Sequence, residues 1–185
     1  SGSCGPSLTY LLEGENLTIT GNGPMTNYTN IVSDIPWYYD RDTIKTVEIS
    51  DGVTTIGSYG FFDCSQLISI TIPESVVFIG KYAFDDCTQL ISITIPSNVE
   101  SIGQRAFHNC FKITFISIPS RLTEIQSMTF SYCYGLASIE FLGEVISIGS
   151  SAFDNCISLS SITIPESVSS IDSYAFNECS KLSSI

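Results

Sequence analysis

Hydrophobic and polar positions repeat along most of this chain with a fixed period of 23 residues. Each period opens with a stretch such as Ile70, Thr71 and Ile72, where apolar and polar residues alternate as in a half-buried β-strand. A proline ends the strand because it cannot donate to a β-ladder, and a glycine marks a corner after two more apolar positions. Each repeat is therefore predicted to begin with a strand, a corner and a short extended segment.

The second half of each repeat has a different spacing. Ala83, Phe84, Cys87 and Leu90 lie at i, i+1, i+4 and i+7, which places them on one face of a short helix. We expect these side chains to point inward together with the apolar strand residues. Each repeat is thus predicted to close with a short helical turn before the chain returns to the next strand.

A fixed period of this length predicts stacked units that cover one another's apolar faces. Residues 46–185 are expected to form six repeats of one solenoid, with a parallel β-sheet on one face and the short extended segments and helical turns on the other. Ile185 would be the first strand position of a seventh repeat, so we expect an incomplete array. Continuation with more repeats is the favoured interpretation, and self-association through the uncapped end is the alternative. The repeats are marked by Cys64, Cys87, Cys110, Cys133, Cys156 and Cys179.

Residues 1–45 lie outside the repeat and are predicted to be a capping segment. Two alternating stretches, residues 8–12 and 17–20, flank a polar turn and predict a β-hairpin. Residues 35–39 are bulky and would cover the first repeat. The end of a solenoid exposes an apolar cross-section, so such a cap is needed.

The frame L-x-x-I-x-I-P-x-x-V-x-x-I-G-x-x-A-F-x-x-C resembles the BspA-type leucine-rich repeat, also called the Treponema pallidum leucine-rich repeat. Leu67, Ile70 and Ile72 match the general leucine-rich frame, whereas the asparagine ladder of the common classes is missing. The resemblance implies a leucine-rich repeat solenoid that is secreted or displayed on the cell surface. It also implies adhesion to host proteins or other cells rather than catalysis, and it extends to the N-terminal capping segment.

Charge narrows the choice of partner. Seven Lys and Arg against 19 Asp and Glu give a net charge of −12. Nucleic acid and anionic membrane both need basic patches, so neither is an expected partner. No apolar run approaches the ~18 residues of a membrane span, and the sequence shows no signal-peptide pattern.

Seven cysteines would suggest disulfides in a secreted chain. Six of them, however, hold one position of the apolar frame, where free cysteine acts as a small buried hydrophobe. Helical turns would also keep neighbouring backbones about 8 Å apart, beyond the ~7 Å between Cα atoms that a disulfide can bridge. We therefore predict a reduced, buried cysteine column, with Cys4 as the one accessible thiol.

No catalytic residue, metal ligand or cofactor site is predicted. His108, the only histidine, lies two residues before Cys110, but a nucleophilic pair needs an exposed thiolate and Cys110 belongs to the core column. His108 is therefore interpreted as a polar surface residue. A loose calcium site stays an alternative to plain solubilising charge on the acidic strips Asp85-Asp86, Asp154-Asn155 and Asn177-Glu178.

One column of residues is predicted to point outward from the strands. Solenoids bind partners through such a face, and Phe115, which replaces a flanking serine, would supply an aromatic anchor there. The hydroxyl-rich face also leaves a glycan-binding module open, although a clustered aromatic platform is missing. The column comprises Glu48, Thr71, Thr94, Ser117, Glu140 and Thr163.

Three consecutive repeats depart from the repeat pattern at the position after the cysteine. Phe111, Tyr134 and Ile157 stand where the outer repeats have serine or threonine. This pattern predicts either local repacking or an exposed apolar stripe of the kind that marks interaction sites. Nearby, Gln126 replaces the corner glycine and Leu142 replaces the proline.

These features favour a non-enzymatic recognition module, on a cell surface or secreted, that binds a host extracellular protein or another cell-surface protein. A structural spacer or stalk that projects another domain is the second interpretation. A glycan-binding module is the third. Nothing in the sequence separates binding from spacing.

Overall fold

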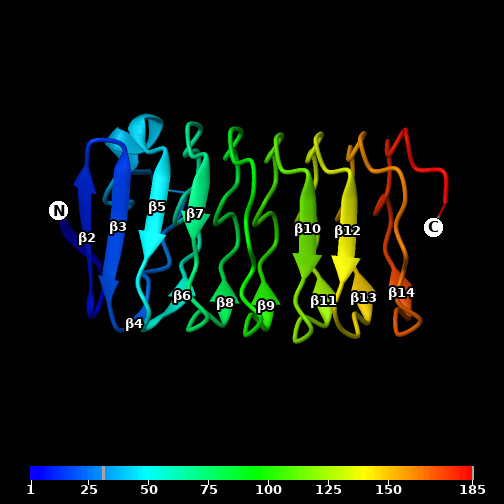
Figure 1. Cartoon of the computed structure of the whole chain (residues 1–185), viewed down its shortest axis with the longest axis horizontal. Coiled ribbons are helices and arrows are strands. Elements are labelled where there is room, and N and C mark those ends of the chain that lie inside the picture. The colour runs from blue at the N-terminus through cyan, green and yellow to red at the C-terminus, as the bar shows by residue number, and fades with distance from the viewer. Residues whose placement is uncertain (31, 185) are drawn as a thin grey trace.

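The computed structural model describes residues 1–30 and 32–184, and this part of the chain forms a β-solenoid. Its coils follow one another along the long axis, from the N-terminal strands at one end to coil 6 at the other (Figure 1). The strand position predicted for Ile185 lies outside the described residues. Each coil is one repeat: coil 1 (46–67), coil 2 (69–90), coil 3 (92–113), coil 4 (115–136), coil 5 (138–159) and coil 6 (161–182).

The predicted strand face is present, and its strands pair in parallel. Equivalent positions of successive repeats stand opposite each other, such as Val47 and Ile70 or Ile116 and Ile139. The strands of this face are β5 (Thr46–Ile49), β7 (Ser69–Thr71), β10 (Phe115–Ile118) and β12 (Ser138–Phe141). The first of these strands pairs with the second, and the third pairs with the fourth.

The short extended segments form a second set of parallel ladders. Isoleucines that stand opposite one another, such as Ile56 and Ile79, point into the core. Two separate sheets result, with the orders β4-β6-β8-β9 and β11-β13-β14. Their strands are β4 (Gly23–Pro24), β6 (Val53–Ile56), β8 (Phe78–Ile79), β9 (Ser101–Ile102), β11 (Glu124–Ile125), β13 (Ser147–Ile148) and β14 (Ser170–Ile171).

The turn side, residues 59–67 and their equivalents, consists of tight turns, and the described residues of the repeats contain no helix. Amides there bond back three residues, as from Cys64 to the Phe61 carbonyl at 3.2 Å. Each coil also has two residues with positive φ, such as Tyr59 at 58° and Asp63 at 57°. Left-handed residues break a right-handed helix, and other amides of the turn bond to the next coil instead, as from Phe61 to Ala83 at 2.8 Å.

A column of phenylalanines fills the centre of the array. Successive ring centroids lie 5.2–5.5 Å apart, with ring planes within 14° of parallel. Trp37 of the capping segment extends this stack onto Phe61 at 5.7 Å. The column members Phe61, Phe84, Phe107, Phe130 and Phe153 are fully buried, and Phe176 is half-buried.

The cysteine column lies beside the phenylalanines, and all seven cysteines are free. The thiols of coils 2 to 6 each donate to a phenylalanine carbonyl of the preceding coil, as from Cys87 Sγ to Phe61 O at 3.2 Å. The expected wide separation of the turn-side backbones is wrong, because these backbones hydrogen-bond to one another. The thiols of coils 2 to 6 are thus directed at main-chain carbonyls and not at one another. Burial raises the pKa of Cys133 to about 12.

Cys4 is not the accessible thiol that the sequence suggested. Its side chain is 2 % exposed, and burial raises its pKa to about 11. Cys179 in coil 6 is only half-buried, so the more accessible thiol lies at the other end of the array.

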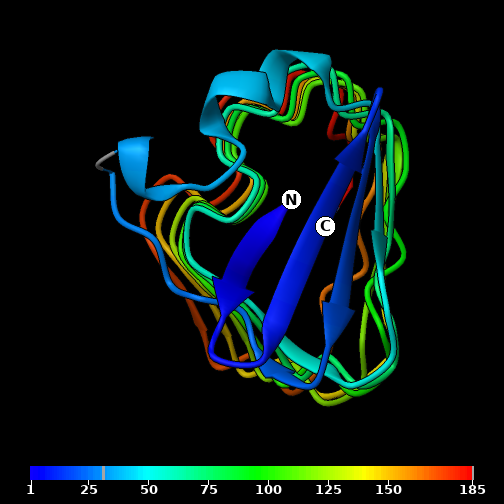
Figure 2. The ribbon, with the colours of Figure 1, turned by 90° about the vertical axis from the view of Figure 1, so that its left-hand side faces the viewer.

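The predicted β-hairpin caps the first coil. β2 (Leu8–Glu13) pairs with β3 (Asn16–Gly21) in antiparallel fashion, and β3 continues the strand face by pairing with β5 in parallel. β1 (Gly2–Gly5) adds to the outer edge of β2. Figure 2 shows β1 and β2 lying across the open end of the coils. Leu8 and Leu17 are buried there, so the apolar cross-section is covered.

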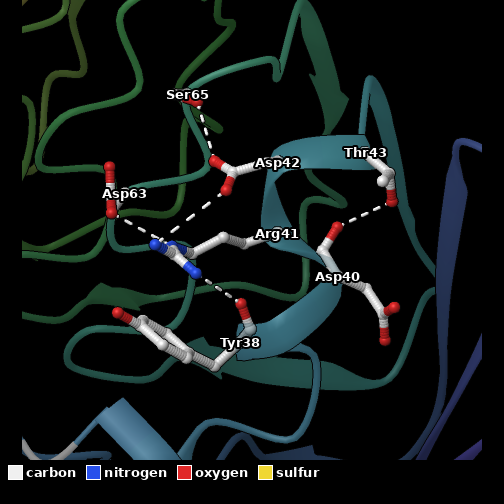
Figure 3. Close-up of polar contacts among 7 residues, drawn as sticks. All are labelled: Tyr38, Asp40, Arg41, Asp42, Thr43, Asp63 and Ser65. Atoms are coloured by element: carbon white, nitrogen blue, oxygen red, sulfur yellow. Dashed lines mark hydrogen bonds and ion pairs between the residues drawn. The ribbon is translucent and has the colours of Figure 1, made fainter.

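Two short 3₁₀ helices, η1 (Val32–Asp34) and η2 (Tyr38–Thr43), complete the capping segment. Arg41 Nε donates to Asp63 at 3.0 Å, and Ser65 donates to Asp42 at 3.0 Å, so η2 is attached to the turn side of coil 1 (Figure 3). One continuous core runs through the capping segment and the repeats. A domain boundary between residues 45 and 46 stays a prediction.

Candidate functional site

The turn-side stripe, defined as Phe111, Tyr134 and Ile157, lies on the outside of the array. The rings of Phe111 and Tyr134 stack with centroids 5.0 Å apart and planes at 22°. Tyr134 is 37 % exposed and Ile157 41 %, whereas Phe111 is half-buried. None of the three belongs to the buried core. The geometry is that of an exposed stripe, and its role in binding stays a prediction.

Two residues that sequence reasoning did not include extend the stripe. Tyr132 meets Tyr134 edge to face at 6.0 Å, and His108 meets Tyr132 in the same way at 5.5 Å. Tyr132 has a φ of 60°, at a position where other coils have residues such as Asp63 and Asn109 that tolerate this conformation better. A tyrosine in place of Asp or Asn was the sequence signal that could have identified it.

His108, interpreted from the sequence as a polar surface residue, is half-buried and contacts a buried carboxylate. Its Nδ1 lies 2.7 Å from the Asp85 carboxylate, and Asp85 is 3 % exposed. The neighbouring acidic side chains are also hydrogen-bonded between coils, since Asn109 donates to Asp86 at 2.7 Å and Asn177 donates to Asp154 at 2.8 Å. Among residues 1–30 and 32–184, no group of three potential metal ligands lies together.

The predicted outward column of the strand face points away from the core. Glu48, Thr71, Thr94, Glu140 and Thr163 are exposed. Ser117 is half-buried, and its hydroxyl lies 3.4 Å from a carboxylate oxygen of the neighbouring glutamate, residue 140. The face presents hydroxyls and two widely separated carboxylates, and its binding role stays a prediction.

Phe115 stands out on this face because it is 48 % exposed and lines two hollows. The first hollow, of about 480 Å³, lies between residues 91–97 of coil 3 and residues 114–120 leading into coil 4, with Leu142 at its margin. The second, of about 570 Å³, lies between β12 and residues 163–165. The β10–β12 pair is therefore flanked by a depression on each side, with Phe115 bordering both.

The stacked parallel ladders and the columns of phenylalanine and cysteine define a leucine-rich repeat solenoid. The family model described as "BspA type Leucine rich repeat region (6 copies)" matches residues 37–137 and 100–185. The chain belongs to the BspA-type leucine-rich repeat family. This result confirms the resemblance inferred from the repeat frame.

Solved structures of bacterial proteins share this architecture. A leucine-rich repeat protein of Bacteroides ovatus is 26 % identical, with a TM-score of 0.78 over 96 % of this chain and 51 % of that one. A leucine rich cell surface protein of Faecalibacterium prausnitzii is 27 % identical, with a TM-score of 0.71 over 97 % and 52 %. The chain thus spans about half the length of these two proteins.

The T. pallidum leucine-rich repeat protein is 24 % identical, with a TM-score of 0.76 over 98 % of this chain and 91 % of that one. At this identity, the likeness supports a shared fold and nothing further. A comparison with curated proteins gives no match. The described part of the chain contains no helix of the length and apolar character that a membrane crossing requires. Proteins of this repeat class generally bind other proteins and do not catalyse reactions.

Proposed function

We propose that this chain is a non-enzymatic protein-recognition module that contacts its partner through the turn-side stripe. The observation that carries the proposal is the row of apolar side chains outside the core on three consecutive coils, with Phe111 stacked on Tyr134 and with Tyr134 and Ile157 exposed. The outer coils have the polar residues Ser65, Thr88 and Ser180 at the same position. Contiguous exposed apolar surface tends to mark interaction sites, and buried aromatic anchors dominate their binding energy.

The proposed setting is a cell surface or the extracellular medium, with adhesion to host proteins or to other cells as the role. Support comes from one similar protein that is described as a cell surface protein. The net charge of −12 favours a partner surface that is neutral or basic around its apolar patch.

The test replaces the stripe with serine in the triple variant Phe111→Ser, Tyr134→Ser and Ile157→Ser. We expect the melting temperature to stay nearly unchanged and binding to a panel of extracellular host proteins to weaken at least about tenfold. The matched control is Thr88→Ala with Ser180→Ala, which changes the equivalent positions of other coils and leaves the bond from Ser65 to Asp42 in place. A large fall in the melting temperature of the serine variant would instead show that these side chains hold the core together.

A spacer or stalk is the second candidate, and the continuous core supports it because close-packed interiors have low compressibility and transmit strain. Failure of the intact chain to bind any protein of the panel, together with silence on a glycan array, would favour this role. A signal on the glycan array alone would favour a glycan-binding module, the third candidate.

A further inference from the structure

The junction between coils 3 and 4 differs from the other junctions in its main-chain pairing. Between coils 4 and 5, the amide of Ala137 donates to Thr114 at 2.9 Å on the strand face, and that of Gly149 donates to Ile125 at 2.7 Å beside the second sheet. Within the described residues, no such bond joins residues 91–103 to residues 114–126. The second set of ladders stops here, with β9 on one side and β11 on the other (Figure 1), and on the strand face no named strand lies between β7 and β10. We call this the open junction.

The open junction is held together on the turn side. Phe107 donates to Thr129 at 2.9 Å and Asn109 donates to Ser131 at 3.0 Å. The rings of Phe107 and Phe130 stack at 5.4 Å, as their equivalents do elsewhere in the column. The two coils therefore meet closely along one side and lack main-chain pairing along the other two.

Gln126 gives a physical reason for the opening. At the equivalent corners, a β-carbon on Gly80, Gly103 or Gly149 would lie 2.3, 2.4 or 2.7 Å from a backbone nitrogen of the preceding coil. Glycine therefore permits the close approach that pairs the coils. Gln126 carries a β-carbon at this corner, which opposes the same close approach, and the preceding coil is unpaired there.

Asp172 is at the equivalent corner of coil 6 and also carries a β-carbon, yet this corner is paired with coil 5. Its amide still donates to Ile148 at 2.9 Å. Coil 4 is paired with coil 5 through both β10–β12 and β11–β13, whereas β13–β14 is the strand pair between coils 5 and 6 in the described residues. The double pairing restrains coil 4 more, so a β-carbon at its corner is harder to accommodate.

We propose that the open junction binds an extended, basic peptide segment of a partner protein on the strand face. The hollow of about 480 Å³ lies between residues 92–95 and β10, whose backbones are not paired with each other. An extended peptide can pair with such free strand edges through its main chain while its side chains enter neighbouring pockets. Phe115 and Leu142, 48 % and 56 % exposed, supply the apolar contacts.

The charges around the open junction select a basic peptide. Glu74 is the charged residue that lines the first hollow, and Glu140 is the one that lines the second, within the part of the chain described. Arg121 of coil 4 forms an ion pair with Glu100 of coil 3, in which Arg121 Nη1 lies 2.9 Å from Glu100 Oε1. Lysine or arginine side chains on the peptide would therefore meet carboxylates without a competing free cation in either hollow.

The test selects a display library of random nonapeptides on the full chain. We expect enriched peptides to alternate apolar with basic residues and to lose affinity at least about tenfold in Gln126→Gly, which restores the corner glycine and lets the ladders close. Asp172→Gly is the matched control, because its corner is already paired. Phe115→Ala, an exposed position, should weaken the same peptides while leaving the fold intact.

Main-chain recognition is checked with the best peptide in a form N-methylated at alternate amides, which should bind at least about tenfold more weakly. Amide hydrogen exchange should slow at residues 92–95 and 115–118 on peptide binding. Equal binding of the methylated peptide, equal loss in Asp172→Gly, or no peptide that prefers the wild type over Gln126→Gly would overturn the proposal.

This site is separate from the turn-side stripe, so its test stands apart from that of the proposed function. The triple serine variant of the stripe should keep its peptide affinity. Loss of peptide binding in that variant, with Gln126→Gly unaffected, would place the peptide on the stripe and refute the open junction as its site.

Discussion

The turn side and the strand face are built from the same coils but hold them together differently. On the turn side every junction keeps its bonds, such as Phe84 to Ala106 at 2.8 Å and Phe130 to Ala152 at 2.9 Å. On the strand face only a single bridge, from Ser69 to Ser92, continues the ladder after β7, and no named strand of this face follows β12 in the described residues. The difference indicates that the turn side, with its phenylalanine and cysteine columns, holds successive coils together. The strand face can therefore vary, and its irregular coils are where binding surface can arise.

The variant with the largest expected loss of stability is Phe107→Ala, in the middle of the phenylalanine column. Removing a fully buried ring should lower the free energy of unfolding by about 3–5 kcal/mol, because the stacks with Phe84 and Phe130 are both lost. Thr94→Ala, on the exposed strand face of the same coil, should stay within about 0.5 kcal/mol. Urea denaturation followed by circular dichroism measures both. Similar losses for the two variants would contradict the assignment of cohesion to the turn side.

Alkaline pH tests the cysteine column. Burial raises the pKa of Cys133 to about 12 from 9.0 and that of Cys110 well above 9.0. The folded chain thus keeps its thiols protonated while the unfolded chain ionises them, so their stabilisation is complete below about pH 9 and is lost as the pH rises toward the folded pKa. Each such thiol should lower the free energy of unfolding by about 1.4 kcal/mol per pH unit in that window.

Urea denaturation at a series of pH values above 9.0, the pKa the thiols have before burial, measures this slope. In Cys110→Ala, the free energy of unfolding should fall less steeply with pH, because one ionising thiol is missing. This difference in slope is expected whatever the stability of the variant itself. A slope identical to that of the wild type would mean that Cys110 ionises as freely in the folded chain as in the unfolded chain, and the column would not be sealed.

Much of the fold was predictable because the repeat imposes it on every coil. The 23-residue period specified the parallel strands, the inward phenylalanines and the buried cysteines. It did not distinguish a helical turn from a tight turn, since Ala83, Phe84 and Cys87 point inward in either. The positive φ of Tyr82 and Asp86 decides between them, and a tyrosine in that conformation carries no clear sequence signal.

The candidate sites were less predictable because they depend on departures from the repeat. The substitution pattern identified Phe111, Tyr134 and Ile157, and their exposure agrees with the stripe. Tyr132 was missed because its left-handed backbone directs the ring in a way that spacing does not reveal. The effect of Gln126 depends on a close backbone approach at the corner, and this approach is visible only in three dimensions.

The smallest expected effect is the stability change in Gln126→Gly. Closing the open junction would restore main-chain hydrogen bonds worth about 0.5–1.5 kcal/mol each, while the glycine costs roughly 0.5–1 kcal/mol in chain entropy. We expect a net gain of about 1 kcal/mol by the same urea titration, together with slower hydrogen exchange at residues 101–102 and 124–125. The reverse change, Gly149→Gln, should open a paired junction and destabilise the chain, because its β-carbon would meet Ser127 N at 2.7 Å. If Gln126→Gly leaves exchange at β9 and β11 unchanged, the corner residue does not control the junction, and the interruption of the strand face must originate in the strands themselves.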